Sequence, residues 1–121
     1  CSNQALCTLA ATVYMSLMGR QGLIEVATQS TQKAHWLAEQ IKEIPGFTIA
    51  YPEASYFREF VVNTPIPAAE LVEKALVRGI YPGLDLGRFG APGQLMIAVT
   101  ETKDMAKLKS LVDFFKEVSH A

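Results

Sequence analysis

The sequence predicts a two-layer α/β (α+β) domain, in which helices pack on a small and mostly antiparallel sheet. Several segments carry apolar residues at helical spacing, and several short segments alternate apolar and polar residues as strands do. The chain has 121 residues, of which 50% are hydrophobic and 19% are charged. This is the size of one domain with a real core. We therefore expect residues 1–121 to form a single domain.

The first part of the chain is predicted to form two helices. A first helix covers residues 4–18, begins at a cap formed by Asn3 or Ser2, and ends at Gly19. A second helix covers residues 23–44. Tyr14, Met15 and Met18 make the first helix apolar nearly all round, so we expect it to expose an apolar face unless another part of a larger protein covers it. Its apolar stripe is Leu6, Leu9, Ala10, Val13 and Leu17, and that of the second is Leu23, Ala27, Ser30, Ala34, Leu37, Ile41 and Ile44.

The middle of the chain reads as two strands and a helix. Residues 47–51 and 57–63 have strand patterns, with a turn at residues 52–55 between them. Pro67 suits the first turn of a helix over residues 68–78, which Gly79 closes. The side chains that this helix is expected to bury are Leu71, Val72, Ala75 and Leu76.

The last third is predicted to add strands and a final helix. A very short strand at residues 80–81 precedes a glycine-rich loop over residues 82–93. The strongest strand covers residues 95–100, and Thr102 caps the last helix. The predicted order is α-α-β-β-α-(β)-β-α. The strand buries Leu95, Ile97 and Val99, and the helix buries Met105, Leu108, Leu111, Val112, Phe115 and Val118.

Charge and motif content disfavour several classes of function. Eleven Lys and Arg against twelve Asp and Glu give a net charge of −1, which offers no excess positive charge for nucleic acid. No stretch is apolar enough to predict a membrane span. Cys1 and Cys7 have neither disulfide nor zinc spacing, so they read as reduced thiols of a cytoplasmic protein. His35 and His120 are predicted to be ordinary surface residues, and no phosphate-binding or dinucleotide motif occurs.

Three residues are candidates for a functional surface. Arg88 is the only arginine of the glycine-rich loop, and its guanidinium suits a carboxylate or a phosphate. Glu101 ends the strongest strand, and Asp85 lies in the same loop as Arg88. The plainer alternative is a surface ion pair of Arg88 with Asp85 or Glu101. Every lysine falls on a predicted helix, mostly on its polar face, so none is expected to form a Schiff base.

An ordered set of short pieces resembles one enzyme family. The chain opens with Cys1-Ser2-Asn3-Gln4-Ala5-Leu6, and the later pieces are Lys33-Ala34-His35, Ile44-Pro45-Gly46-Phe47, Glu59-Phe60-Val61-Val62, Gly79-Ile80, Gly83-Leu84-Asp85-Leu86-Gly87 and Ala98-Val99-Thr100-Glu101-Thr102. In this order, they resemble subunit 1 of glycine dehydrogenase (decarboxylating), the P-protein of the glycine cleavage system. The resemblance covers nearly the whole chain.

The resemblance implies the C-terminal small domain of the fold-type I enzymes, which depend on pyridoxal phosphate. Residues 1–20 would be the helix that leads from the large domain of a longer chain. The implied activity is decarboxylation of glycine and transfer of the aminomethyl group to the lipoyl arm of H-protein. The resemblance also implies that the cofactor lysine belongs to subunit 2, that two copies of each subunit form a heterotetramer, and that this part of the chain holds no catalytic, cofactor-binding or metal residue. Arg88, Glu101 and Asp85 would then border the subunit junction or the active-site entrance.

Two other functions remain open from the sequence. One is the small domain of another fold-type I enzyme, such as an aminotransferase or a cysteine desulfurase. The other is a stand-alone ligand-binding module with a ferredoxin-like sheet. The absence of a starting Met and the long leading helix favour part of a longer protein over such a module.

Overall fold

A computed structural model describes residues 3–120. Its elements are α1 (Ala5–Lys42), β1 (Thr48–Ile49), β2 (Glu59–Asn63), α2 (Ala68–Val77), β3 (Leu84–Asp85), the short 3-10 helix η1 (Gly87–Phe89), β4 (Gln94–Ala98) and α3 (Met105–Ser119). The strands form one antiparallel sheet in the order β1-β2-β4-β3. The predicted class, helices on a small antiparallel sheet, is confirmed.

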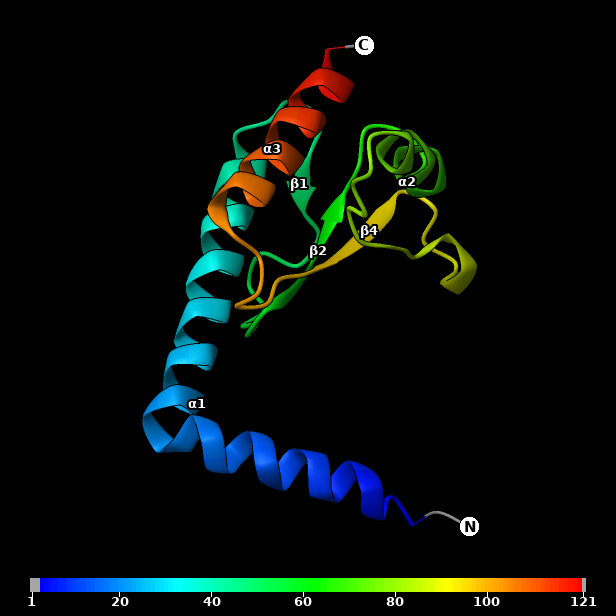
Figure 1. The fold of residues 1–121 in the computed structure, drawn as a ribbon. Helices are drawn as coiled ribbons and strands as arrows, with labels where there is room; N and C mark the ends of the chain where they lie inside the picture. Colours follow the sequence, from blue (N-terminus) through cyan, green and yellow to red (C-terminus); the bar gives the residue numbers. More distant parts are fainter. Residues whose placement is uncertain (1–2, 121) are drawn as a thin grey trace.

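The first two predicted helices form one element with a sharp kink. Gly19 has φ 61° and ψ −176° inside α1, a conformation that glycine adopts readily. The helix therefore changes direction at the predicted residue, but it resumes directly after the kink. The kink divides α1 into a first arm, residues 5–18, and a second arm, residues 20–42. Figure 1 shows the first arm standing away from the rest of the domain, while the second arm runs along it. The expected side-chain cap at Asn3 is wrong, since Gln4 begins the helix with no side-chain hydrogen bond, and Ser2 lies outside the described residues.

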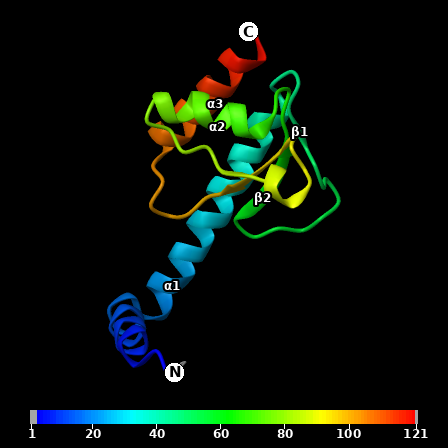
Figure 2. The same cartoon turned by 90° about the vertical axis from the view of Figure 1, so that its right-hand side faces the viewer.

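One face of the sheet carries the core. Alternate residues of β2 and β4 are buried, including Phe60, Val62, Leu95 and Ile97, and Val99 just beyond β4 continues the series. The second arm of α1 packs with α3, as Figures 1 and 2 both show. Aromatic rings fill the space near the end of α3, where Phe47 and Phe115 stack with ring centroids 4.8 Å apart.

Several local predictions are wrong for identifiable reasons. Residues 80–81 form no strand; the strand lies four residues later, at β3, because Pro82 has no N–H for a ladder. Asp104, and not Thr102, caps α3, because its carboxylate accepts a hydrogen bond from the Lys107 N–H at 2.8 Å. Leu23, Leu76 and Met105 are exposed rather than buried, and α3 buries Phe114 in addition to most of the predicted stripe.

Within residues 3–120, no helix combines the length and the apolar character that crossing a membrane requires. Cys7 is a free and exposed thiol, whereas Cys1 lies outside the described residues. His35 and His120 are exposed, as expected. The His35 ring stacks on that of Tyr56, with centroids 4.3 Å apart.

Gly83 fixes the start of β3, and its replacement gives a first testable prediction. A Cβ at this position would lie 2.4 Å from the main-chain oxygen of Met96 and 3.2 Å from Leu95 Cγ. We expect Gly83→Ala to lower the free energy of unfolding by about 1–3 kcal/mol in urea denaturation, because backbone must move to relieve the contact. Gly93→Ala is the control, since nothing lies within 4 Å of its Cβ position. Equal effects of the two changes would show that β3 is not held as described.

Candidate functional site

The loop that carries Arg88 is held by its own acidic residue. Asp85 ends β3, and its Oδ1 accepts a hydrogen bond from the Gly87 N–H at 2.8 Å. This bond starts the turn of η1, which ends at Gly90 with φ 90°. Asp85 is therefore a structural residue of the loop, and its carboxylate shapes the turn rather than pairing with Arg88.

Arg88 is presented at the surface of this loop. Its guanidinium lies over the ring of Phe89, with 4.8 Å between Cζ and the ring centroid, and both side chains are exposed. None of the ion pairs formed within residues 3–120 includes Arg88. The expected surface pair with Asp85 or Glu101 is therefore not formed. The guanidinium keeps its donors free for an anion.

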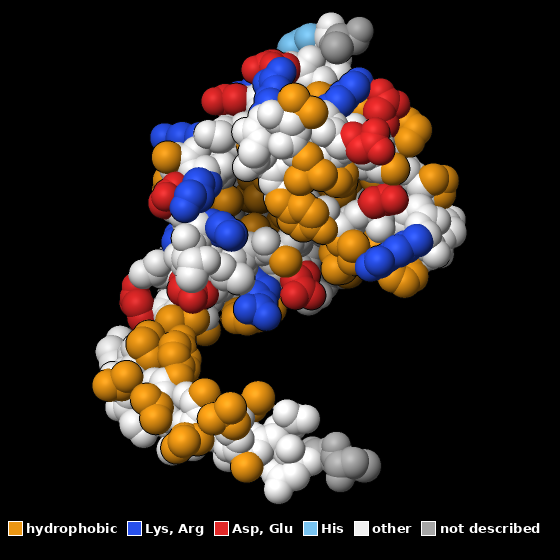
Figure 3. All heavy atoms as spheres, turned by 45° about the vertical axis from the view of Figure 1, so that its right-hand side comes forward, with side chains coloured by type: hydrophobic (Ala, Val, Ile, Leu, Met, Phe, Trp, Pro, Cys, Tyr) orange, Lys and Arg blue, Asp and Glu red, His pale blue; other side chains and the backbone are white. Residues whose placement is uncertain are grey.

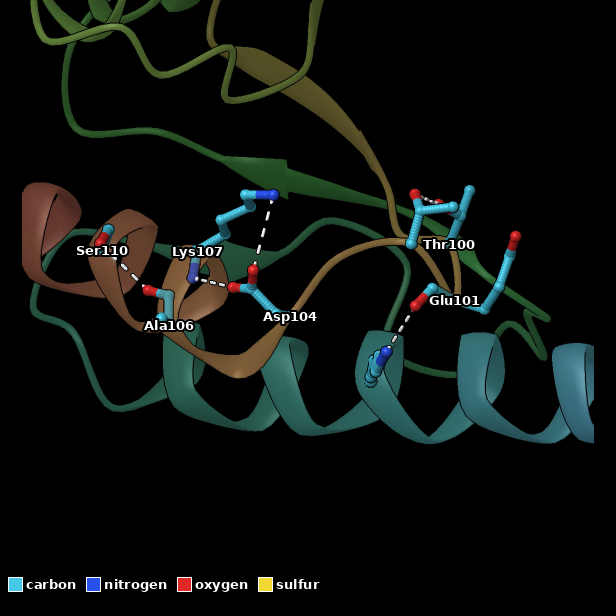
Figure 4. A network of polar contacts seen from close by, with 8 residues as sticks. Thr100, Glu101, Asp104, Ala106, Lys107 and Ser110 are labelled. Carbon is cyan, nitrogen blue, oxygen red and sulfur yellow. Dashed lines mark hydrogen bonds and ion pairs between the residues drawn. The ribbon is translucent and has the colours of Figure 1, made fainter.

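Glu101 lies at the other end of β4. Lys33 of α1 donates a hydrogen bond from Nζ to the main-chain oxygen of Glu101 at 2.7 Å, which ties this turn to the long helix. Figure 4 shows that the Glu101 carboxylate points away from this bond, while the Thr100 hydroxyl takes part in a contact of its own. Arg88 precedes β4 and Glu101 follows it, and a strand from Gln94 to Ala98 covers roughly 13 Å. The structure does not bring Arg88 and Glu101 together.

The start of α3 adjoins the Glu101 turn. Asp104 accepts from the Lys107 N–H and lies 3.5 Å from Lys107 Nζ, as Figure 4 shows. The hydrogen bond from that backbone N–H lowers the pKa of the Asp104 carboxyl from its ordinary value. The charged form of Asp104 is thus favoured where it caps the helix.

A groove that the sequence did not predict lies between α3, the end of β4 and the segment from Gly79 to Pro82. It has a volume of about 440 Å³ and a mainly apolar lining. Figure 3 shows hydrophobic side chains in the hollowed centre of this face. Its floor and walls include Leu37, Ile97, Val99, Leu108 and Leu111, and Tyr81, Lys103 and Lys107 also border it. The groove depends on the meeting of segments far apart in the chain, which no local pattern reveals.

The lysines of the domain do not fit a Schiff base with pyridoxal phosphate. Lys33 is half-buried and donates to Glu101 and, at 3.4 Å, to Gln29. All the other lysines of the described residues are exposed, including Lys103 and Lys107 at the groove. A Schiff-base lysine is desolvated in a pocket to lower its pKa. Residues 3–120 also hold no group of three His, Cys, Asp or Glu side chains that could bind a metal ion.

The fold, with helices packed on a four-stranded antiparallel sheet, is the class of structure found in fold-type I enzymes. A solved glycine decarboxylase (P-protein) of the glycine cleavage system, in inhibitor-bound form, matches 88% of this chain and 24% of its own, with 28% identity and a TM-score of 0.79. A NifS-like protein from Rickettsia africae matches 80% of this chain and 30% of its own with 15% identity and a TM-score of 0.67, which shows the fold alone.

The sequence comparison gives the family. The model of the family "Glycine cleavage system P-protein" matches residues 1–115. The chain belongs to this family. A protein of Chlorobium luteolum named probable glycine dehydrogenase (decarboxylating) subunit 1 is 52% identical over 119 residues, which are 98% of this chain and 26% of that protein. The chain thus spans about a quarter of the length of such relatives.

Proposed function

We propose that these residues form the C-terminal small domain of subunit 1 of a glycine-decarboxylating enzyme. That enzyme would decarboxylate glycine and transfer the aminomethyl group to the lipoyl arm of H-protein. The family match over residues 1–115 carries this proposal, together with 52% identity to a relative that bears the subunit 1 name. The domain acts in the enzyme as a structural and interface part and has no activity alone.

The cofactor of the proposed enzyme is pyridoxal phosphate, which serves as an electron sink for the decarboxylation when it is bound. The lysines of this domain, which are exposed except for the half-buried and hydrogen-bonded Lys33, support a cofactor lysine on subunit 2 instead. In this arrangement, the domain's contribution is to complete the assembly around the active site. We place the enzyme in the cytoplasm as a heterotetramer with two copies of each subunit, with lipoylated H-protein as its transient partner.

The first arm of α1 supports an interface role. Within this arm, Leu6 is 79% exposed and Leu17 is 81% exposed, and Leu9, Val13, Tyr14 and Met15 are also exposed. Figure 3 shows hydrophobic side chains along the arm that extends from the domain. A contiguous exposed apolar surface of this kind is typical of an interaction site. We propose that residues 1–20 lead from the large domain and that the rest of the enzyme covers the arm.

Reconstitution tests the proposed reaction. Full-length subunit 1 carrying this domain, a subunit 2 of the family and lipoylated H-protein are combined with pyridoxal phosphate and ¹⁴C-carboxyl-labelled glycine. We expect release of labelled carbon dioxide only when both subunits are present. Release by subunit 2 and H-protein at the same rate without subunit 1 would contradict the proposed role.

The Arg88 loop gives a second prediction in the same system. We propose that Arg88, with Asp85 holding its turn, borders the entrance or subunit junction, where it engages an anion such as the glycine carboxylate or an acidic surface of H-protein. Glu101 would lie at the same junction from the other end of β4. Arg88→Ala is expected to lower glycine turnover or the apparent affinity for H-protein by about tenfold, equal to about 1.4 kcal/mol.

Lys109→Ala is the matched control, because Lys109 is another exposed cation but lies on α3. If Arg88→Ala leaves both quantities within about twofold of the unmutated enzyme, a change of about 0.4 kcal/mol, then the loop has no functional role.

A further inference from the structure

The two edges of β4 are paired to different extents. Along one edge, β2 pairs with all of β4, from Gln94 to Ala98. Along the other edge, β3 pairs only with Leu95 and Met96. The end of β4 is therefore an open strand edge, and such edges are ready templates for another extended segment.

The hydrogen-bond pattern identifies which backbone groups are free. Val99 donates from its N–H to the Arg58 oxygen at 2.9 Å, so the backbone of odd-numbered residues of this strand faces β2. Leu86 donates to the Gln94 oxygen at 3.0 Å, so even-numbered residues face the β3 side. Ala98 consequently directs its N–H and C=O to the open edge. Within residues 3–120, no backbone hydrogen bond joins Ala98 to that side.

The residue opposite Ala98 leaves this edge open. Continuing the register of β3 and β4 places Pro82 across from Ala98. Pro82 has no N–H to donate to the Ala98 oxygen, and within residues 3–120 no hydrogen bond joins the Ala98 N–H to the Pro82 oxygen. The close approach of Gly83 to the Met96 oxygen fixes the chain just after Pro82. The segment before Pro82 separates from β4, and the groove described above occupies the space between them.

The residues that line the groove suit a segment that carries both apolar and acidic side chains. Its floor is apolar, because Leu37, Ile97 and Val99 are buried there. Lys103 and Lys107 border it, and Lys107 is partly offset by Asp104 at 3.5 Å. None of the ion pairs within the described residues includes Lys103. An extended segment with alternating apolar and acidic side chains would match the floor and the rim at once.

We propose that an extended acidic segment of the same polypeptide, outside these 121 residues, adds to the open edge of β4 and fills the groove. The relatives are about four times as long as this chain, since it spans 26% of one of them, and a full-length subunit 1 of that size, as proposed above, would supply such a segment. The open edge is short and offers few hydrogen bonds. A separate chain would lose its translational freedom for this small gain, whereas a tethered segment is held at a high effective concentration.

Site-specific photo-crosslinking in full-length subunit 1 tests the proposal, which rests on family membership but not on the proposed reaction. The photoreactive residue p-benzoylphenylalanine replaces Tyr81, which is 68% exposed at the groove, or Tyr51, which is 57% exposed outside it, as the control. After irradiation of subunit 1 alone and of its complex with subunit 2, mass spectrometry identifies the joined peptides.

We expect the Tyr81 position to crosslink to one acidic peptide of the same polypeptide beyond these 121 residues, in both samples, while the Tyr51 position does not. Crosslinks from Tyr81 to subunit 2, to a second copy of subunit 1, or to nothing would overturn the proposal. Because the readout is a crosslink rather than turnover, a failed reaction assay does not affect it.

Removing the positive charges of Lys103 and Lys107 at the edge of the groove gives a second test. The double change Lys103→Gln and Lys107→Gln is expected to lower the yield of the Tyr81 crosslink about fivefold, because the acidic side chains lose their partners. Lys109→Gln is the control, because Lys109 is an exposed lysine of α3 that does not line the groove. An unchanged yield in the double variant would contradict an acidic occupant.

Discussion

Replacing Phe115 with alanine is expected to lower the free energy of unfolding by about 3–5 kcal/mol. Phe115 is fully buried, stacks on Phe47 at 4.8 Å and lies 5.8 Å from the ring of Phe114. Removing the ring leaves a cavity where α3 packs against Phe47, just before β1. The surrounding side chains can close this cavity only in part. Urea denaturation followed by circular dichroism measures the change.

Phe57→Ala is the matched control, because Phe57 is 53% exposed. Its effect is expected to stay within about 0.5 kcal/mol, as for other surface substitutions. A Phe115→Ala variant no less stable than Phe57→Ala would mean that α3 does not pack on the core as described.

The exposed arm of α1 should make the isolated 121-residue chain associate with itself and bind a hydrophobic dye. The triple change Leu6→Gln, Leu9→Gln and Leu17→Gln is expected to convert the associated protein to a monomer and to remove most of the dye fluorescence. Each leucine gains about 1.5–3 kcal/mol when its side chain is buried, and all three are more than half exposed here. Analytical ultracentrifugation and dye titration measure the two effects.

Val77→Gln serves as the control for this surface. Val77 is 89% exposed but belongs to α2, outside the arm. It should leave association and dye binding unchanged. An unmutated chain that stays monomeric at high concentration and binds no dye would contradict the interface role of the arm.

The sequence predicts best the features that are decided locally, by one residue or by the spacing of a few neighbours along the chain. Gly19 adopts the positive φ that kinks α1, and the alternation of Leu95, Ile97 and Val99 correctly assigns the buried face of the sheet. Both features follow from backbone preference or from period alone. The cap of α3 was missed because Thr102 and Asp104 both suit that position, and only the path of the chain after β4 decides between them.

Features that arise where segments far apart in the chain meet could not be predicted from the sequence. Phe114 lies off the expected stripe of α3 but is buried, and Arg78 at the end of α2 lies over its ring with Cζ 5.3 Å from the ring centroid. The same limit applies to the candidate surface. Arg88 stands in a glycine-rich loop as expected, but its contact with Phe89 and its separation from Glu101 depend on tertiary structure. The groove beside Ala98 likewise arises where Pro82 faces β4.

The proposed division of labour between the subunits is tested most directly by locating the cofactor. Borohydride reduction converts the covalent adduct between pyridoxal phosphate and lysine into a stable pyridoxyl group, which peptide mass spectrometry can assign to one residue. In the reconstituted two-subunit enzyme, we predict this group on a lysine of subunit 2 and on none of the lysines of residues 1–121. A near-stoichiometric pyridoxyl group on Lys33 or on any other lysine of this domain would contradict the account.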